Sequence, residues 1–163
     1  MKLWGVVGWK NAGKTGLMER LVSEFTGRGL SVSTIKHAHH GFDVDHPGKD
    51  SYRHREAGAR EVLVASAARY AVLHELRDAA EPGLDALVAR LSPVDLVLVE
   101  GYKRDRHPKI EAWRAVNANP LIADEDETVR AVAADTPLMR DQPVFDLDDT
   151  VSIADFIAQD LEL

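Results

Sequence analysis

The N-terminal segment holds the pattern that most constrains the fold of this chain. Residues 2–8, KLWGVVG, form an apolar run without a helical period, which is typical of a buried strand. Leu17 and Leu21 then recur at helical spacing, so a helix is predicted over residues 13–29. The chain must therefore pass from a strand directly into a helix through a short glycine-containing loop.

This loop matches the spacing G-x-x-x-x-G-K-[ST] at every fixed position. Glycines let the backbone close around an anion, and the free N–H groups at the start of the helix attract the same charge. In this motif the lysine reaches the β- and γ-phosphates of a nucleotide, and the hydroxyl binds Mg²⁺. A glycine-rich turn with a solvent-facing lysine is the alternative, but it does not require the full spacing. The predicted nucleotide contacts are Gly8, Asn11, Ala12, Gly13, Lys14, Thr15 and Gly16.

A second apolar strand, residues 94–101, carries Glu100 near its end. In a P-loop fold, a carboxylate at the carboxyl end of such a strand holds the water shell of Mg²⁺. Glu100 is better placed for this than Asp95, which opens the same strand; a plain strand-end carboxylate at a turn is the alternative. The sequence therefore predicts Lys14 and Glu100 as catalytic groups, and Thr15 and Glu100 as the metal site.

The segment after residues 30–36 is rich in histidine, lysine and arginine, and several chemistries fit it. Basic side chains, with His37 and Arg53 as candidates, can hold a second anion such as a phosphorylated cofactor. Histidines with nearby carboxylates can bind Zn²⁺ or Ni²⁺, although the surrounding cations disfavour a metal alone. The candidate metal ligands are His37, His39, His40, Asp43 and Asp45, and Asp43, Asp45 or Asp50 can instead orient water or Mg²⁺. A solvated loop with incidental histidines is the remaining alternative.

Predicted strands and helices alternate along the rest of the chain. Further strands are expected over residues 61–66, 69–76, 109–116, 128–135 and 143–149, and further helices over residues 50–59, 83–91 and from Ser152. Asp50 is expected to cap its helix, and the period-two alternation of residues 109–116 predicts an edge or antiparallel strand. The pattern predicts an α/β fold of the P-loop NTPase type, with a doubly wound, mostly parallel sheet and an antiparallel extension, as a single domain over residues 1–163.

Composition excludes several classes of protein. The chain has a net charge of −7 and no cysteine, so disulfides and thiolate metal sites are excluded, and non-specific binding to nucleic acid is disfavoured. Residues 1–60 hold ten Lys and Arg against six Asp and Glu, which suits an anionic ligand near the phosphate motif. The sequence has no signal-peptide pattern and no apolar run long enough to span a membrane. A cytoplasmic protein with neither nucleic-acid nor membrane partners is therefore expected.

Four stretches of the chain resemble the MobB family, P-loop proteins linked to synthesis of the molybdopterin guanine dinucleotide form of the molybdenum cofactor. They are GWKNAGKT, TIKHAHHGFDVDHPGKDSYRHREAGA, DLVLVEGYK and HPKIEAWR, and they follow the family's order. The resemblance implies GTP binding with Mg²⁺, weak GTPase activity, a homodimer, and an adapter role toward the MobA guanylyltransferase, with molybdopterin as a further bound ligand. It carries over Gly8, Gly13, Lys14 and Thr15 as nucleotide contacts and Glu100 as the acid.

The chain departs from the family pattern at Gly16, where a second threonine is common, and it has no N-K-x-D signature for guanine. The choice of GTP over ATP therefore comes from the resemblance alone. A nickel metallochaperone GTPase of the HypB or UreG type is the alternative function, and it requires a metal at the histidines. A small-molecule kinase is a third option, for which neither a lid nor an acceptor-binding base is recognised. Any enzymatic activity is expected to be at most slow GTP hydrolysis.

Overall fold

The computed structural model describes residues 1–38 and 41–163, and the chain divides into two units. The larger unit comprises Met1–His37 and Leu84–Leu163, and the smaller unit comprises Ala38–Gly83. The single domain over residues 1–163 stays a prediction.

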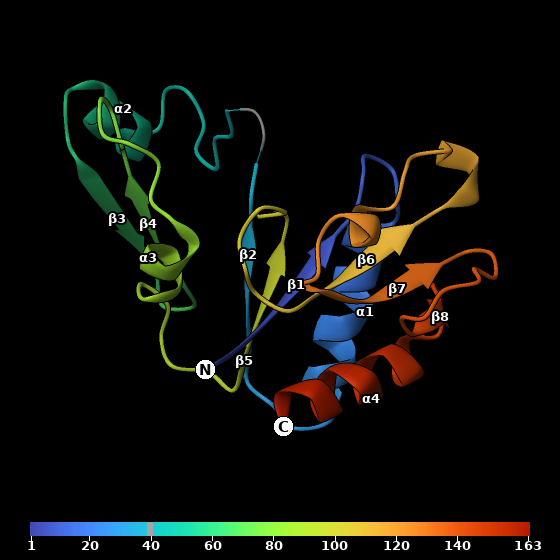
Figure 1. The fold of residues 1–163 in the computed structure, drawn as a ribbon. Helices are drawn as coiled ribbons and strands as arrows, with labels where there is room; N and C mark the ends of the chain where they lie inside the picture. The colour runs from blue at the N-terminus through green and yellow to red at the C-terminus, as the bar shows by residue number, and fades with distance from the viewer. Residues whose placement is uncertain (39–40) are drawn as a thin grey trace. The chain divides into compact units, whose positions relative to one another are not determined.

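The larger unit is built on a six-stranded sheet in which all neighbouring strands are parallel. The strand order is β2-β5-β1-β6-β7-β8 (Figure 1). The strands are β1 (Lys2–Val7), β2 (Val32–Lys36), β5 (Leu96–Glu100), β6 (Lys109–Trp113), β7 (Val129–Ala134) and β8 (Val144–Asp146). Because the strands share one direction, the segments that follow them gather at one edge of the sheet. The predicted α/β fold with a mostly parallel sheet is confirmed.

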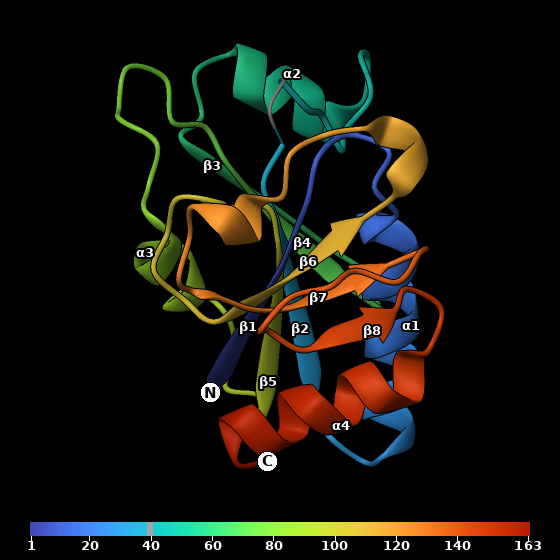
Figure 2. The ribbon, with the colours of Figure 1, turned by 45° about the vertical axis from the view of Figure 1, so that its right-hand side comes forward.

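Strand β1 lies between β5 and β6, and its alternating side chains enter two hydrophobic layers. Trp4 and Val6 join the cluster formed with helices α1 (Lys14–Gly27) and α4 (Thr150–Leu161), which lie side by side (Figure 2). Val7 belongs to a separate cluster on the other side of the sheet. The remaining helical segments of this unit are α3 (Leu84–Val88), η1 (Ala115–Asn117) and η2 (Ile122–Asp124). Strand β1 is therefore packed on both faces of the sheet. This packing fixes the position of the residue from which the following loop begins.

The prediction of an edge or antiparallel strand over residues 109–116 is wrong. Strand β6 is parallel to both of its neighbours, β1 and β7, and four of its five residues are buried. The prediction came from the alternation of Ile110 and Ala112 with Glu111 and Trp113, which suggested a solvent-facing side. The charged residues of that side are Lys109 and Glu111. Both are fully buried with partners: the Lys109 Nζ donates to Asp126 Oδ2 over 3.0 Å, and the Glu111 carboxylate accepts from backbone N–H groups at the start of η2.

The smaller unit contains helix α2 (Asp50–Glu56) and a hairpin of two antiparallel strands, β3 (Glu61–Ala65) and β4 (Tyr70–His74). This hairpin is the antiparallel component of the fold. The prediction that Asp50 caps α2 is wrong, since Lys49 holds the N-cap position with an extended backbone (φ −75°, ψ 154°). Asp50 is instead the first residue of the helix, where a carboxylate is favourable because of the helix dipole.

No helix in the described part of the chain combines the length and the apolar character needed to cross a bilayer.

Candidate nucleotide-binding site

The loop between β1 and α1 has the backbone that its glycines predict. Gly8, Asn11 and Gly13 have positive φ angles of 145°, 63° and 95°. A Cβ at Gly8 would collide with the carbonyl oxygen of Ala112 in β6, so only glycine fits there. Successive residues of this kind form the concave backbone that binds anions in phosphate loops.

The start of α1 adds further donors to this loop. Gly13 is the N-cap residue, and no side chain caps the helix. Among the residues that the structure describes, the backbone N–H groups of Gly13, Lys14, Thr15 and Gly16 have no hydrogen-bond acceptor. Four such groups together with the positive end of a 14-residue helix favour an anion at this point.

The Lys14 side chain folds back over the loop. Its Nζ donates to the carbonyl oxygen of Trp9 over 2.8 Å. Burial lowers the pKa of Lys14, the nearby Glu100 carboxylate raises it, and Lys103 and Lys36 lower it further. The ammonium group therefore stands at the loop with two other cations close by.

Thr15 and Glu100 meet across the ends of α1 and β5. The Thr15 Oγ1 lies 3.5 Å from Glu100 Oε1, and the Lys36 Nζ lies 3.7 Å from the same oxygen. Lys36 and Glu100 are also register partners in the β2–β5 pair. A hydroxyl beside a carboxylate oxygen is the ligand chemistry that Mg²⁺ prefers, so these residues fit the metal that the motif predicts.

Asp95 lies at the opposite end of β5 and has a structural role. Its Oδ2 accepts from both the backbone N–H and the hydroxyl of Ser31, over 2.8 and 2.6 Å. These bonds hold the pKa of Asp95 below its usual value. The carboxylate ties the start of β5 to the residue before β2, away from the phosphate loop.

The two other predicted anion contacts, His37 and Arg53, belong to different units of the chain. The His37 ring stacks on Tyr102, with centroids 4.6 Å apart, beside the left-handed residue Gly101 at the end of β5. Arg53 is exposed on α2, in the smaller unit. The roles of His37 and Arg53 as anion contacts stay predictions.

The candidate metal ligands of the histidine-rich segment have other partners. Arg55 binds both carboxylate oxygens of Asp43 over 2.9–3.0 Å and lies 3.6 Å from Asp45. The Arg55 hydrogen bonds lower the pKa of Asp43. His39 and His40 lie outside the described residues. Among the residues described, no group of three or more His, Cys, Asp or Glu side chains is arranged to hold a metal ion.

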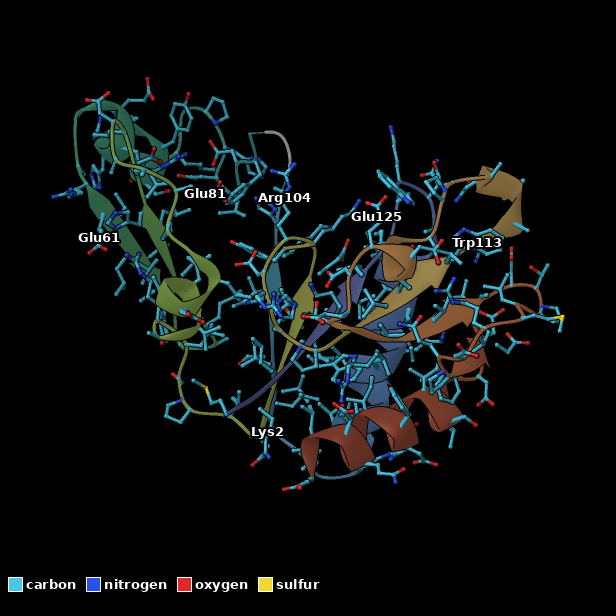
Figure 3. All side chains as sticks on the ribbon, in the orientation of Figure 1. Lys2, Glu61, Glu81, Arg104, Trp113 and Glu125 are labelled. Atoms are coloured by element: carbon cyan, nitrogen blue, oxygen red, sulfur yellow. The ribbon has the colours of Figure 1, made fainter. Side chains whose placement is uncertain are left out.

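Two basic residues near the loop are absent from the site predicted from the sequence. The Lys103 Nζ lies 4.1 Å above the Trp9 ring, and the buried Nε of Arg114 lies 3.3 Å from where a Cβ at Gly13 would stand. Arg114 follows Trp113, which ends β6 (Figure 3). The available signal was positional, since each cation comes shortly after the end of a strand and so reaches the edge of the sheet where the loop lies.

Comparisons with known proteins agree with this fold and show the family of the chain. The sequence model of the family "MobB: Molybdopterin guanine dinucleotide synthesis protein B" matches residues 3–135. The molybdopterin-guanine dinucleotide biosynthesis adapter proteins of Escherichia coli and Haemophilus influenzae are 40% and 41% identical to this chain, over 96% and 95% of it and over 91% and 86% of their own lengths. The crystal structure of a MobB homologue from Bacillus stearothermophilus is 31% identical, with a TM-score of 0.73 over 99% of both chains. The chain therefore belongs to the MobB family.

Proposed function

We propose that this chain binds GTP with Mg²⁺ at the Gly8–Thr15 loop and acts as an adapter in molybdopterin guanine dinucleotide synthesis. The observation that supports nucleotide binding is the loop itself. Among the described residues, the N–H groups at the start of α1 have no acceptor, and the Lys14 ammonium bonds the Trp9 carbonyl of the same loop. A polyphosphate satisfies these donors with charge-assisted hydrogen bonds, and lysine offsets its charge.

Thr15 and Glu100 would hold the metal. Mg²⁺ supplies charge neutralisation at the β- and γ-phosphates when it is bound. The Thr15 hydroxyl would ligate the metal directly, and Glu100 would accept hydrogen bonds from its water shell. The Lys36 ammonium and the Thr15 hydroxyl both approach the same oxygen of Glu100. Hydrolysis is expected to be slow, because the sequence identifies neither a glutamine that orients water nor an arginine finger.

The adapter role follows the names of the relatives, which are molybdopterin-guanine dinucleotide biosynthesis adapter proteins. We propose that the partner of this chain is the MobA guanylyltransferase. We also propose that the histidine-rich segment binds molybdopterin. A cytoplasmic location accords with such a role.

We propose that the chain forms a homodimer through the β3–β4 hairpin of the smaller unit. A two-stranded sheet is marginally stable alone, and this one exposes Leu63 (63%), Tyr70 (68%) and Val72 (53%). Exposed apolar side chains gathered on one hairpin favour a protein partner. A second copy of the chain provides an equivalent hairpin.

Calorimetric titration with a non-hydrolysable GTP analogue and Mg²⁺ tests the nucleotide site. Lys14→Ala is expected to weaken binding by roughly 100-fold or more, since one ammonium of the phosphate cradle is lost. Lys2→Ala, at the opposite end of β1, is the matched control and should bind as the wild type does. Absence of binding to the wild-type protein would refute the proposal.

A further inference from the structure

A cavity of about 330 Å³ opens beyond the carboxyl ends of β7 and β8. Its walls are mixed, with the apolar residues Pro137, Leu138, Val144 and Phe145 beside the polar residues Asp135, Thr136 and Asp146. The volume is at the lower end of small-molecule sites, which span roughly 300–1,000 Å³. The cavity lies at the carboxyl edge of the sheet, which is the edge where ligands of parallel α/β sheets bind.

Two carboxylates in the cavity wall are each fixed through one oxygen. Asp135 Oδ1 accepts from the backbone N–H of Ala115, and Asp146 Oδ1 accepts from that of Asp148, both over 2.9 Å. Among the described residues, neither Oδ2 has a hydrogen-bond donor. The cavity therefore combines apolar residues with two oriented acceptors, which suits a flat ligand that presents N–H donors at its edge.

Two side chains connect the cavity wall to the β1–α1 loop. Leu147, which follows Asp146, lies 3.1 Å from where a Cβ at Gly13 would stand. Arg114, which precedes the Ala115 amide bound by Asp135, lies 3.3 Å from the same point. Leu147 and Arg114 thus connect the cavity wall to the loop in which the phosphates are proposed to lie.

We infer that this cavity receives the nucleotide base and that Asp135 and Asp146 select guanine over adenine. The inference rests on the proposed nucleotide site. Guanine carries the N1–H and N2–H₂ donors on one edge, whereas adenine has an unprotonated acceptor at N1. A carboxylate oxygen pairs with the guanine donors but leaves two facing acceptors when it meets adenine N1. The two aspartates thus do the work of the N-K-x-D signature that the sequence lacks.

Competition binding with GTP, ATP, xanthosine triphosphate and inorganic tripolyphosphate tests the inference. The wild-type protein should prefer GTP to ATP by about 30-fold or more. Asp135→Asn and Asp146→Asn should each weaken GTP binding by about 10- to 100-fold and leave tripolyphosphate binding unchanged. Asp135→Asn should also gain affinity for xanthosine triphosphate, because the new amide donates to the carbonyl that xanthine has in place of the guanine amine. A purely structural role would not produce that gain.

Asp141→Asn is the matched control. Asp141 is exposed between β7 and β8 and does not line the cavity, so its substitution should leave the preference for GTP intact. If the Asp135 and Asp146 variants keep the GTP-to-ATP ratio while tripolyphosphate still binds, the base lies elsewhere and the inference is overturned, although the phosphate site stands. If the wild type binds neither GTP nor tripolyphosphate, both proposals fall together.

Discussion

Lys36 and Glu100 face each other at the ends of two paired strands, with the Nζ 3.7 Å from Oε1, and the Thr15 hydroxyl lies 3.5 Å from the same oxygen. One carboxylate thus connects β2, β5 and the first turn of α1 at the edge where the phosphate loop lies. This relationship makes Glu100 the most informative position for separating metal binding from phosphate binding.

Glu100→Gln should remove the effect of Mg²⁺ on nucleotide binding. The amide keeps the shape of the side chain but loses the charge that attracts the metal's water shell. Affinity for a GTP analogue should therefore be the same in Mg²⁺ and in a chelator, whereas the wild type should bind more tightly with Mg²⁺. Asp95→Asn, at the other end of β5, should retain the Mg²⁺ effect. Full Mg²⁺ dependence in Glu100→Gln would exclude Glu100 from the metal site.

Gly8→Ala should destabilise the protein by about 2–4 kcal/mol, because the new methyl group meets the Ala112 carbonyl in a backbone conformation that side chains disfavour. Gly27→Ala is the control, since open space surrounds that position in the last turn of α1. It should be neutral or stabilise by up to about 1 kcal/mol. Urea unfolding followed by circular dichroism measures both, and equal stability of the two variants would contradict the argument.

Lys109→Ala should destabilise the protein by about 3–5 kcal/mol. The change leaves Asp126 and the carbonyl oxygens of Lys103 and Asp105 without their buried donor. Lys2→Ala removes an exposed lysine of the same sheet and should change the unfolding free energy by less than about 0.5 kcal/mol. The same urea denaturation experiment measures both variants. A loss of unfolding free energy below about 1 kcal/mol for Lys109→Ala would show that its buried contacts add little to stability.

The stability of the protein should fall as the pH drops from about 6.5 to about 4 because of His107. Burial lowers the pKa of this side chain to about 4, and Lys109 lowers it as well, while Asp105 and Asp126 raise it. The unfolded chain therefore takes up a proton in this window before the folded chain does, so protonation favours unfolding as the pH falls. The loss should amount to roughly 2–4 kcal/mol at most.

His107→Gln isolates the contribution of His107 to the pH dependence of stability, because glutamine does not titrate between about pH 4 and 6.5. The difference in unfolding free energy between wild type and variant should change between about pH 6.5 and 4 and stay constant above pH 7. A difference that is flat across the whole range would mean that His107 becomes protonated without cost in the folded protein.

Val72→Glu should convert the proposed homodimer to a monomer. Val72 is 53% exposed and pairs directly with Leu63 in the hairpin, so a charge there disrupts an apolar contact surface. Val116→Glu places the same charge on a residue that is 83% exposed in η1, and it should leave the dimer intact. Light scattering after size-exclusion chromatography gives the mass of each. A monomeric wild type would refute the dimer.

The elements with local signals were predictable from the sequence. The strand, glycine loop and helix at the N-terminus follow from the apolar pattern and the spacing of Gly8 and Gly13, and Glu100 follows from the apolar strand that it ends. Strand β6 was misjudged because the burial of Lys109 depends on Asp126, a partner 17 residues away. Such pairings become visible only when the strand order is known.

Arg114, one of the two basic residues near the loop, and the two cavity aspartates were not predicted, for a similar reason. Arg114 reaches Gly13, and Asp135 reaches the amide of Ala115, because β6 lies between β1 and β7. No motif spacing encodes that order. The sequence therefore predicted the phosphate end of the candidate site and left open the end where the base is proposed to lie.

The close fit between Gly8 and the neighbouring strand has a thermodynamic consequence for any ligand of the loop. Since the chain turns against Ala112 of a buried parallel strand, its backbone is already ordered before an anion arrives. Association then carries little entropy cost for arranging the donors, and more of the intrinsic interaction energy appears as affinity. A preorganised cradle of this kind should capture even a bare polyphosphate, without help from the rest of a nucleotide.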